Sequence, residues 1–133
     1  MTHSPSIAVV VVNWNSGQYL GKCLQNLKNQ ILSPARVLIV DNASKDGSMD
    51  GLEQSFSEWE FIRLDKNTGF ASANNLAVNQ AEDCDWIAFL NPDAFANPDW
   101  LEKLSKAAEE FPECASFGSH MLRYGSDKID GTG

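Results

Sequence analysis

The stretch IAVVVVNWN, residues 7–15, joins an uninterrupted apolar run to a polar end. Consecutive apolar residues that are mostly β-branched are typical of a strand covered on both faces, as in a parallel sheet. Asn13 and Asn15 follow the run and are not core-like residues. The stretch therefore predicts a buried parallel strand whose carboxyl end carries polar side chains.

Similar short runs recur about every 25 to 30 residues, the length of a strand, a crossover helix and the turns between them. The further runs cover residues 37–40, 61–64, 86–90 and 115–121. Helical patterns lie between them, and we expect these helices to begin near Ser16, at Ser48, near Phe70 and at Asn97. This alternation predicts an α/β fold with a mostly parallel sheet and helices on both faces.

The composition fits one globular domain that spans residues 1–133. The chain is 43% hydrophobic and 21% charged, which provides enough apolar surface for a core. Its formal net charge of -8 argues against a nucleic-acid-binding surface, which needs clustered Lys and Arg. Cys23, Cys84 and Cys114 are widely spaced and odd in number, so we expect buried reduced thiols.

The apolar run at residues 7–12 is too short to cross a membrane and lacks the charged leader of a signal peptide. We therefore expect a cytoplasmic protein. Peripheral association with the inner face of the cell membrane stays open, and so does assembly into a homo-oligomer.

Polar residues follow four of the predicted strands, at the point where each strand ends. They are residues 13–15, 41–42, 65–69 and 91–93. Ligands of open α/β sheets bind at the carboxyl ends of the strands, where these segments are expected to meet. The sequence therefore predicts a binding site built from these segments.

Asp41 and Asn42 follow the second apolar run and lead through a polar loop to Ser48. A carboxylate at this position can accept a hydrogen bond from the imide N–H of a uracil or thymine ring, and Ser48 would cap the next helix. The simpler alternative is that Asp41 and Asn42 only form an Asx-type turn.

The segment DKNTGFASANN, residues 65–75, places a glycine and small side chains at the start of a helix. Gly69 allows a tight turn after Asn67, and small residues let a ligand approach the backbone. Asn74 and Asn75 are adjacent amides in an apolar helix, where an amide without hydrogen bonds would be costly. We expect one of them to point toward the ligand.

Asn91-Pro92-Asp93 follows the fourth apolar run. A carboxylate at the edge of a sheet suits Mg²⁺ or Mn²⁺, which prefer oxygen ligands and often take substrate phosphates as well. Such an ion would offset the charge of a diphosphate in an acidic protein. The alternative is that this tripeptide is only a turn.

Together, these segments resemble the family 2 glycosyltransferases of the GT-A fold, and especially their rhamnosyltransferase-like branch. The resemblance extends over essentially the whole chain and implies a Rossmann-like nucleotide-sugar-binding domain. It matches Asp41 to the carboxylate that contacts the nucleobase and Asp93 to the metal ligand. Asn91 departs from the family, because many members carry an aspartate there. The remaining residues assigned to the nucleotide-sugar site are Asn13, Asn15, Asn67, Gly69, Asn75 and Asn91.

The resemblance implies an inverting, metal-dependent transferase of polysaccharide biosynthesis, with a UDP- or dTDP-linked sugar as donor and a saccharide or lipid-linked acceptor. Family members use a carboxylate on a later segment as the general base. We expect the 133 residues to stop before that acceptor half, so no catalytic residue is assigned. A non-catalytic nucleotide-sugar-binding or assembly module is the alternative function.

Two other α/β classes fit less well. A nicotinamide-dependent dehydrogenase needs a glycine-rich turn after its first strand, where this chain has Gly17 alone. A response-regulator-like module should carry paired acids after the first strand and a lysine after the fifth, and the sequence has neither. The four tryptophans, Trp14, Trp59, Trp86 and Trp100, have no motif context and are interpreted as packing or surface residues.

Overall fold

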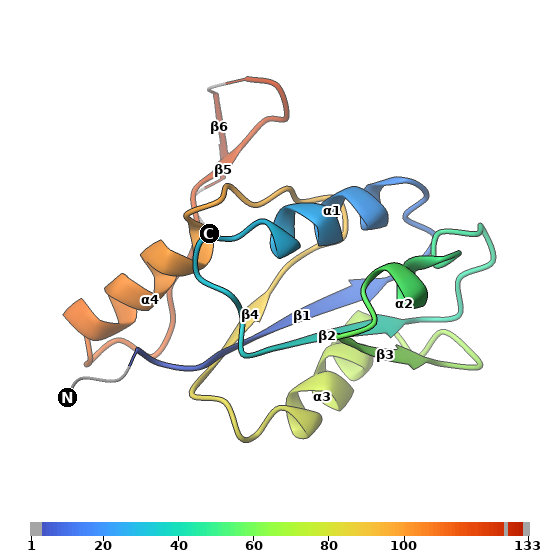
Figure 1. Ribbon diagram of the computed structural model, residues 1–133, viewed down its shortest axis with the longest axis horizontal. Coiled ribbons are helices and arrows are strands. Elements are labelled where there is room, and N and C mark those ends of the chain that lie inside the picture. Colours follow the sequence, from blue (N-terminus) through green and yellow to red (C-terminus); the bar gives the residue numbers. More distant parts are fainter. Residues whose placement is uncertain (1–3, 127, 132–133) are drawn as a thin grey trace.

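Four of the predicted runs form one parallel sheet in the computed structural model, which describes residues 4–126 and 128–131 (Figure 1). The strand order is β3-β2-β1-β4. The strands are β1 (Ile7–Asn13), β2 (Arg36–Asp41), β3 (Glu60–Arg63) and β4 (Trp86–Phe89). Every residue of β1 is buried, which agrees with its place between two neighbouring strands and two layers of helices.

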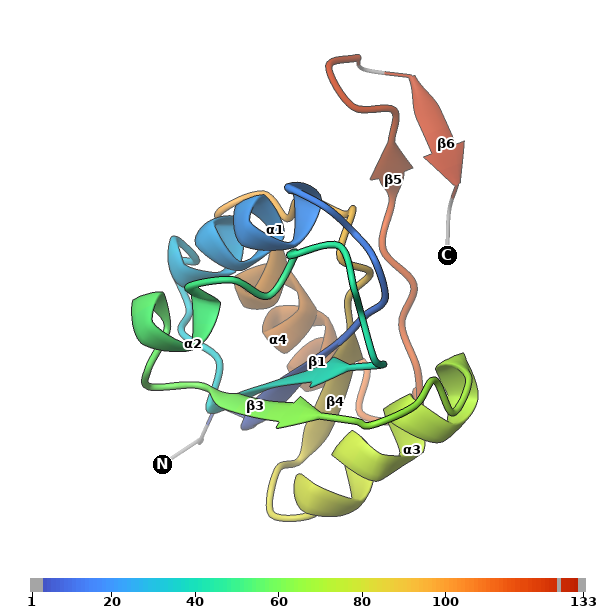
Figure 2. The same ribbon diagram turned by 90° about the vertical axis from the view of Figure 1, so that its right-hand side faces the viewer.

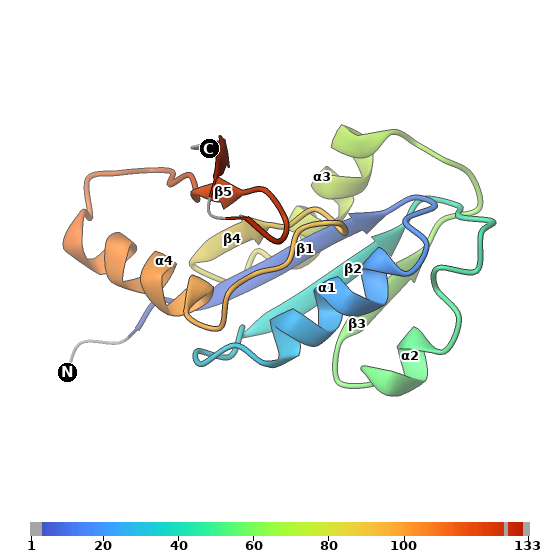
Figure 3. The ribbon, with the colours of Figure 1, turned by 90° about the horizontal axis from the view of Figure 1, so that it is seen from above.

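Helices cover both faces of the sheet, as predicted (Figures 2 and 3). They are α1 (Tyr19–Lys28), α2 (Leu52–Ser55), α3 (Phe70–Gln80) and α4 (Trp100–Glu110). Alternate residues of β1 point to opposite faces of the sheet. Val9 and Val11 pack in the core with α1, whereas Val10 packs in the core with α3. The short side chains Ala73 and Ala77 bring α3 close to the sheet.

Three helices begin later than the sequence predicts. Tyr19 opens α1 after a turn in which its N–H donates to the Ser16 carbonyl at 3.1 Å. Trp100 opens α4 after a similar turn onto the Asn97 carbonyl at 3.0 Å, so Asn97 is not the N-cap. Capping prediction fails here because a tight turn precedes the first helical residue.

The start predicted for the second helix, at Ser48, is also wrong, because α2 begins at Leu52. Gly51 has a φ of 74°, in the left-handed region, and separates Ser48 from α2. The hydroxyl of Ser48 instead accepts a hydrogen bond from the amide of Asn13 at 2.9 Å. Ser48 therefore belongs to the site at the end of the sheet.

The predicted fifth strand at residues 115–121 is wrong. Within the described residues, that segment pairs only at its end, where β5 (Met121–Leu122) meets β6 (Ile129–Gly131) in a separate antiparallel hairpin. The segment is attached by side chains, because the Phe117 ring lies 5.5 Å from that of Trp86 and Trp100 Nε1 donates to Ser119 Oγ at 2.9 Å. The hairpin stands away from the sheet (Figures 1 and 2).

All three cysteines lie in the described part of the chain and are free thiols. Cys23 is buried as expected, but Cys84 and Cys114 are only half-buried. Cys114 also lies outside any helix or strand, in the turn after α4. In the part of the chain that the structure describes, no helix is both long and apolar enough to span a membrane.

Candidate functional site

Asn13 and Asp41 end the two central strands and are paired in register. Asn13 is completely buried, and its Nδ2 donates to Asp41 Oδ1 at 3.0 Å. The same nitrogen lies 3.2 Å from Ser44 Oγ and 2.9 Å from Ser48 Oγ. Among the residues described, nothing donates to Asn13 Oδ1. The Asn13 amide thus binds neighbouring protein groups, and its role as a ligand contact stays a prediction.

The carboxylate of Asp41 is almost enclosed, with 4% of the residue exposed. Its Oδ2 accepts from Ser44 N–H at 3.3 Å, so the Asx-type turn considered from the sequence is present. Ala43 lies inside this turn with a φ of 67°, an unusual conformation for a residue with a side chain. A carboxylate has lone pairs for more than two hydrogen bonds, so the turn leaves Asp41 able to accept another.

The loops after β1 and β2 are joined by hydrogen bonds. Asn15 has a φ of 49°, and its Oδ1 accepts from Lys45 N–H at 2.9 Å. Its own N–H donates to Ser44 Oγ at 2.8 Å, and Gly17 N–H donates to Asp46 Oδ2 at 2.8 Å. Hydrogen bonds from Ser48 and Gly17 lower the pKa of the Asp46 carboxyl. The two loops therefore form one unit, and Trp14 projects from it with 57% of its surface exposed.

Asn42 connects this unit to the turn before α3. Its Oδ1 accepts from Thr68 N–H at 2.9 Å, and its Nδ2 donates to the Gly69 carbonyl at 3.2 Å. Asn67 closes the turn by accepting from Gly69 N–H at 2.8 Å, and Gly69 has a φ of 89°. The sequence predicts no role for Asn42 beyond a turn. Its place directly after a buried strand and beside Asp41 was the available signal.

The adjacent amides of α3 differ in their surroundings. Asn74 is buried, and its Nδ2 donates to the Phe70 carbonyl one turn earlier at 3.1 Å. Asn75 is exposed. The buried amide is thus satisfied within its own helix, and Asn75 is the one that a ligand could reach.

Asn91 and Asp93 follow β4 with both residues exposed. The Asn91 carbonyl accepts from Ala94 N–H at 3.0 Å and from Cys23 Sγ at 3.6 Å, so the tripeptide does form a turn. Burial raises the pKa of the Cys23 thiol to about 12, and the nearby charge of Asp93 adds to the shift. Asp93 therefore lies near the buried Cys23 of α1.

The chemistry of Asn91 and Asp93 fits a hard divalent ion that takes much of its coordination from elsewhere. They offer one carboxylate and one amide oxygen, and Mg²⁺ often takes one carboxylate together with waters and substrate phosphates. The described residues contain no group of three His, Cys, Asp or Glu side chains that could hold a metal ion alone.

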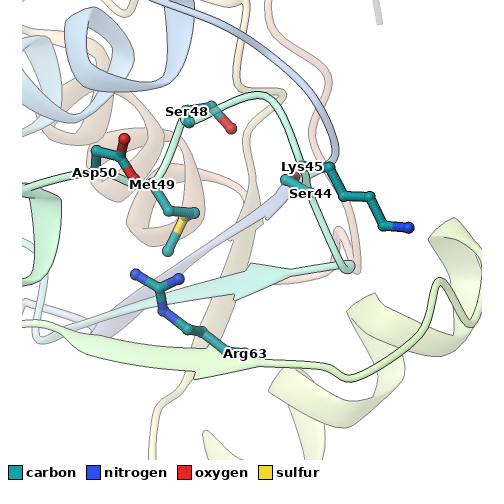
Figure 4. A pocket seen from close by; sticks show the side chains of 7 residues that line it. Ser44, Lys45, Ser48, Met49, Asp50 and Arg63 are labelled. Carbon is teal, nitrogen blue, oxygen red and sulfur yellow. The ribbon is translucent and has the colours of Figure 1, made fainter.

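A pocket of about 340 Å³ is lined by the β2–α2 loop and Arg63 (Figure 4). The Arg63 guanidinium points toward Met49 and Asp50, whereas Lys45 points away from them. Arg63 also forms an ion pair with Glu53. The residues that line the pocket are Ser44, Lys45, Gly47, Ser48, Met49, Asp50 and Arg63. The pocket shares only the two serines with the Asn13 network and does not define the site.

The sheet brings the predicted residues to one edge in three groups. Asn13 and Asp41 at the ends of β1 and β2 form one group with Asn15 in the loop after β1, and Asn42 ties Asn67 and Gly69 to it. Asn91 and Asp93 follow β4, which is the other neighbour of β1. The group with Asp41 therefore lies between the turn of Asn67 and Gly69 and the group with Asp93, so the edge offers two carboxylates with amides around them. It is suited to an elongated ligand with a hydrogen-bonding ring and an anionic part.

Comparison with known proteins gives consistent matches. The family model "Glycosyl transferase family 2" matches residues 8–131. The putative glycosyltransferase EpsH of Bacillus subtilis is 26% identical over 113 residues, covering 79% of this chain and 31% of that protein. The N-acetylglucosaminyl-diphospho-decaprenol L-rhamnosyltransferase of Mycobacterium tuberculosis is 26% identical over 122 residues, covering 84% of this chain and 40% of that protein.

Two groups of solved structures share the fold. S. aureus TarS 1-349 in complex with UDP-GlcNAc has a TM-score of 0.72 at 24% identity, over 80% of this chain and 32% of that one. The mannosyltransferase PcManGT from Pyrobaculum calidifontis, in complex with GDP-Man and Mn2+, has a TM-score of 0.70 at 22% identity. That match covers 92% of this chain and 37% of PcManGT. The chain thus spans well under half the length of the proteins it matches.

Proposed function

Because the chain belongs to glycosyl transferase family 2 and has its GT-A fold, we propose that it binds the nucleotide-diphosphate sugar of an inverting, metal-dependent glycosyltransferase. Residues 1–133 would form the nucleotide-sugar-binding part. The observation that carries this proposal is the Asn13–Asp41 pair, which sets a carboxylate at the carboxyl edge of the sheet. Asp93 follows β4, the strand on the other side of β1. The donor would be linked to UDP or dTDP.

Asp41 would recognise the base. Its Oδ2 has only the long 3.3 Å bond from Ser44 N–H described for it, so this oxygen is suited to accept from the imide N–H of uracil or thymine. Trp14 is exposed on the adjoining loop, where its ring could stack on the base. Asn15, Asn67, Gly69 and Asn75 would line the nucleotide-sugar.

Asp93 would hold Mg²⁺ or Mn²⁺, with Asn91 as a neutral oxygen ligand to the ion or to the ribose. A bound ion there would neutralise the diphosphate as it becomes the leaving group. PcManGT was solved in complex with GDP-Man and Mn2+, which supports a divalent ion in this fold. Until the diphosphate and waters complete its coordination, such an ion is held by few protein ligands, so it should bind together with the nucleotide.

The acceptor side is the less defined part of the proposal. A saccharide or lipid-linked acceptor in polysaccharide biosynthesis is supported by the names of relatives such as the decaprenol-linked rhamnosyltransferase. No catalytic base is assigned. The cytoplasmic location, the peripheral contact with the membrane and the homo-oligomer stay predictions. A non-catalytic nucleotide-sugar-binding module remains the competing function.

Calorimetric titration tests the proposal with UDP, dTDP, CDP, ADP and GDP, each with and without Mn²⁺. We expect UDP or dTDP to bind best, and binding to strengthen with Mn²⁺. Asp93→Ala should lose the Mn²⁺ effect, and Asp41→Ala should lose the preference for uracil and thymine. Preference for a purine diphosphate, or equal binding by Asp93→Ala in saturating Mn²⁺, would contradict the assignments. A transfer assay with UDP- and dTDP-sugars separates the enzyme from the binding module.

A further inference from the structure

The side-chain amide of Asn13 is the hub of the buried network at the end of the sheet. Three oxygens lie within hydrogen-bond distance of its Nδ2, although an NH₂ group has only two hydrogens. The two serine hydroxyls among them can also donate, as Ser48 does to Asp46. The Asp41 carboxylate, in contrast, can only accept hydrogen bonds, so it needs a donor from another residue. The amide is therefore needed chiefly by Asp41.

The contact with Asn13 decides how the Asp41 carboxylate is turned. Asn13 occupies Oδ1 at 3.0 Å, which leaves Oδ2 with the longer bond from Ser44 N–H. The register pairing of the two residues holds this geometry, because their backbones lie side by side in the sheet. Without the amide, the plane of the carboxylate could rotate about the Cβ–Cγ bond, and neither oxygen would be held in one direction.

Asn13 is also a poor choice for stability alone. Its Oδ1 is buried and no described residue donates to it, which is unfavourable for a polar atom away from water. A β-branched apolar residue would suit the end of a buried strand without an unmet acceptor. A buried polar atom without a hydrogen-bond partner is expected where a residue is kept for function and not for stability.

We infer that Asn13 is a positioning residue, which selects the base of the donor by fixing the Asp41 carboxylate without touching the nucleotide. This inference rests on the proposed role of Asp41. Uracil presents an imide N–H to the fixed Oδ2, whereas cytosine presents an unprotonated nitrogen at that ring position. Asn13 would therefore govern the discrimination between uracil and cytosine nucleotides, while the diphosphate and metal contacts are common to both.

The ratio of the dissociation constants for CDP and UDP, measured in saturating Mn²⁺ on the 133-residue chain, tests this role. Asn13→Ala should lower the ratio by about tenfold, the effect of losing an oriented hydrogen bond to a charged group, mainly by weakening UDP. In the double variant with Asp41→Ala, the loss of Asn13 should change the ratio no further, because the amide acts through that carboxylate.

Gln30→Ala is the matched control. Gln30 is also a buried amide with several hydrogen bonds, but it joins α1 to α4, away from Asp41. Its loss should lower stability and leave the ratio unchanged. If Asn13→Ala does not fold, Asn13→Thr supplies a β-branched residue with a hydroxyl that can donate, and it should keep a ratio above that of Asp41→Ala.

The two proposals fail in different ways. A parent chain that binds UDP and CDP equally overturns the role of Asp41 and this inference with it. A parent chain that prefers UDP, together with a folded Asn13→Ala variant that keeps the full preference, overturns the inference alone. A further fall of the ratio in the double variant would also overturn it, because Asn13 would then act directly on the nucleotide.

Discussion

At the residue scale, uncharged amide side chains hold the segments of the candidate site in place. Asn13, Asn15 and Asn42 each connect two segments that are distant in sequence. An amide can donate and accept at once, so one side chain can satisfy two backbone or side-chain groups. It also adds no charge to a chain whose net charge is already -8. The carboxylates Asp41 and Asp93 can therefore act on a ligand while amides hold the loops.

Trp14 is an exposed aromatic side chain on the loop after β1, next to Asn13 and Asn15. Trp14→Ala should weaken UDP binding by about tenfold or more, since stacking on an aromatic ring contributes about 1 to 3 kcal/mol per base. Trp14→Phe should keep most of the affinity. Phe111→Ala serves as the control, because Phe111 is also exposed but caps the far end of α4. Equal UDP affinity in Trp14→Ala and the parent would exclude stacking.

The buried thiol of Cys23 should make the folded protein less stable at alkaline pH. Burial raises its pKa from 9.0 to about 12, so the folded thiol keeps its proton while the unfolded one releases it above pH 9. The free energy of unfolding should therefore fall between pH 9 and about 12, by up to about 1.4 kcal/mol per pH unit from this group. Urea unfolding from pH 8 to 11 should show a shallower slope for Cys23→Ala than for the parent. Parallel slopes would show that Cys23 does not contribute.

At the element scale, the start of α4 is capped by a side chain that is distant in sequence. None of α1, α2, α3 and α4 has a side-chain hydrogen bond from its N-cap residue. The first turn of α4 instead donates Leu101 N–H to Gln30 Oε1 at 3.1 Å, and Gln30 Nε2 donates to the Asn97 carbonyl at 2.6 Å. Gln30, the second residue after α1, thus caps α4.

Removal of that contact should destabilise the junction of α1 and α4. Gln30→Ala would leave the Leu101 N–H buried without its acceptor, at a cost of about 1 to 3 kcal/mol in the free energy of unfolding. Gln25→Ala is the control, because Gln25 lies on the exposed side of α1 and its change should fall within about 0.5 kcal/mol. Urea unfolding measures both variants. Equal midpoints for the two would refute the capping role.

Charge is the feature that matters at the scale of the whole molecule. A formal charge of -8 opposes the approach of a nucleotide diphosphate, whatever the local contacts. Salt screens such repulsion, since the Debye length falls from about 30 Å at 0.01 M to about 10 Å at 0.1 M ionic strength. A metal ion at Asp93 would offset part of the same repulsion locally.

The salt dependence of nucleotide binding should therefore be opposite to that of a basic protein. Without Mn²⁺, UDP binding should strengthen as ionic strength rises from about 0.01 M to about 0.1 M, and the effect should be smaller in saturating Mn²⁺. Calorimetry at several concentrations of potassium chloride would measure it. Weaker binding with salt in the absence of metal would indicate that local cations, such as Lys45, outweigh the net charge.

Local sequence patterns were enough to predict the parallel strands and the edge that carries the site. The apolar runs that became β1 to β4 are local patterns, and each is followed by its polar segment in the chain. Because parallel strands end at the same edge, the order of strands and helices was sufficient to bring Asp41, Gly69 and Asp93 to one side of the sheet. The run at residues 115–121 has the same local pattern, yet it makes side-chain contacts instead of joining the sheet.

The packing of distant segments determines which polar residues face a ligand and which hold the protein together. Asn13 and Asp41 lie 28 residues apart, and Gln30 and Leu101 lie 71 apart. Hydrogen bonds over such separations depend on how strands and helices pack, and no local pattern of residue types records them. Asn13 therefore looked like a ligand contact in the sequence, and the register of β1 with β2 made it a buried partner of Asp41.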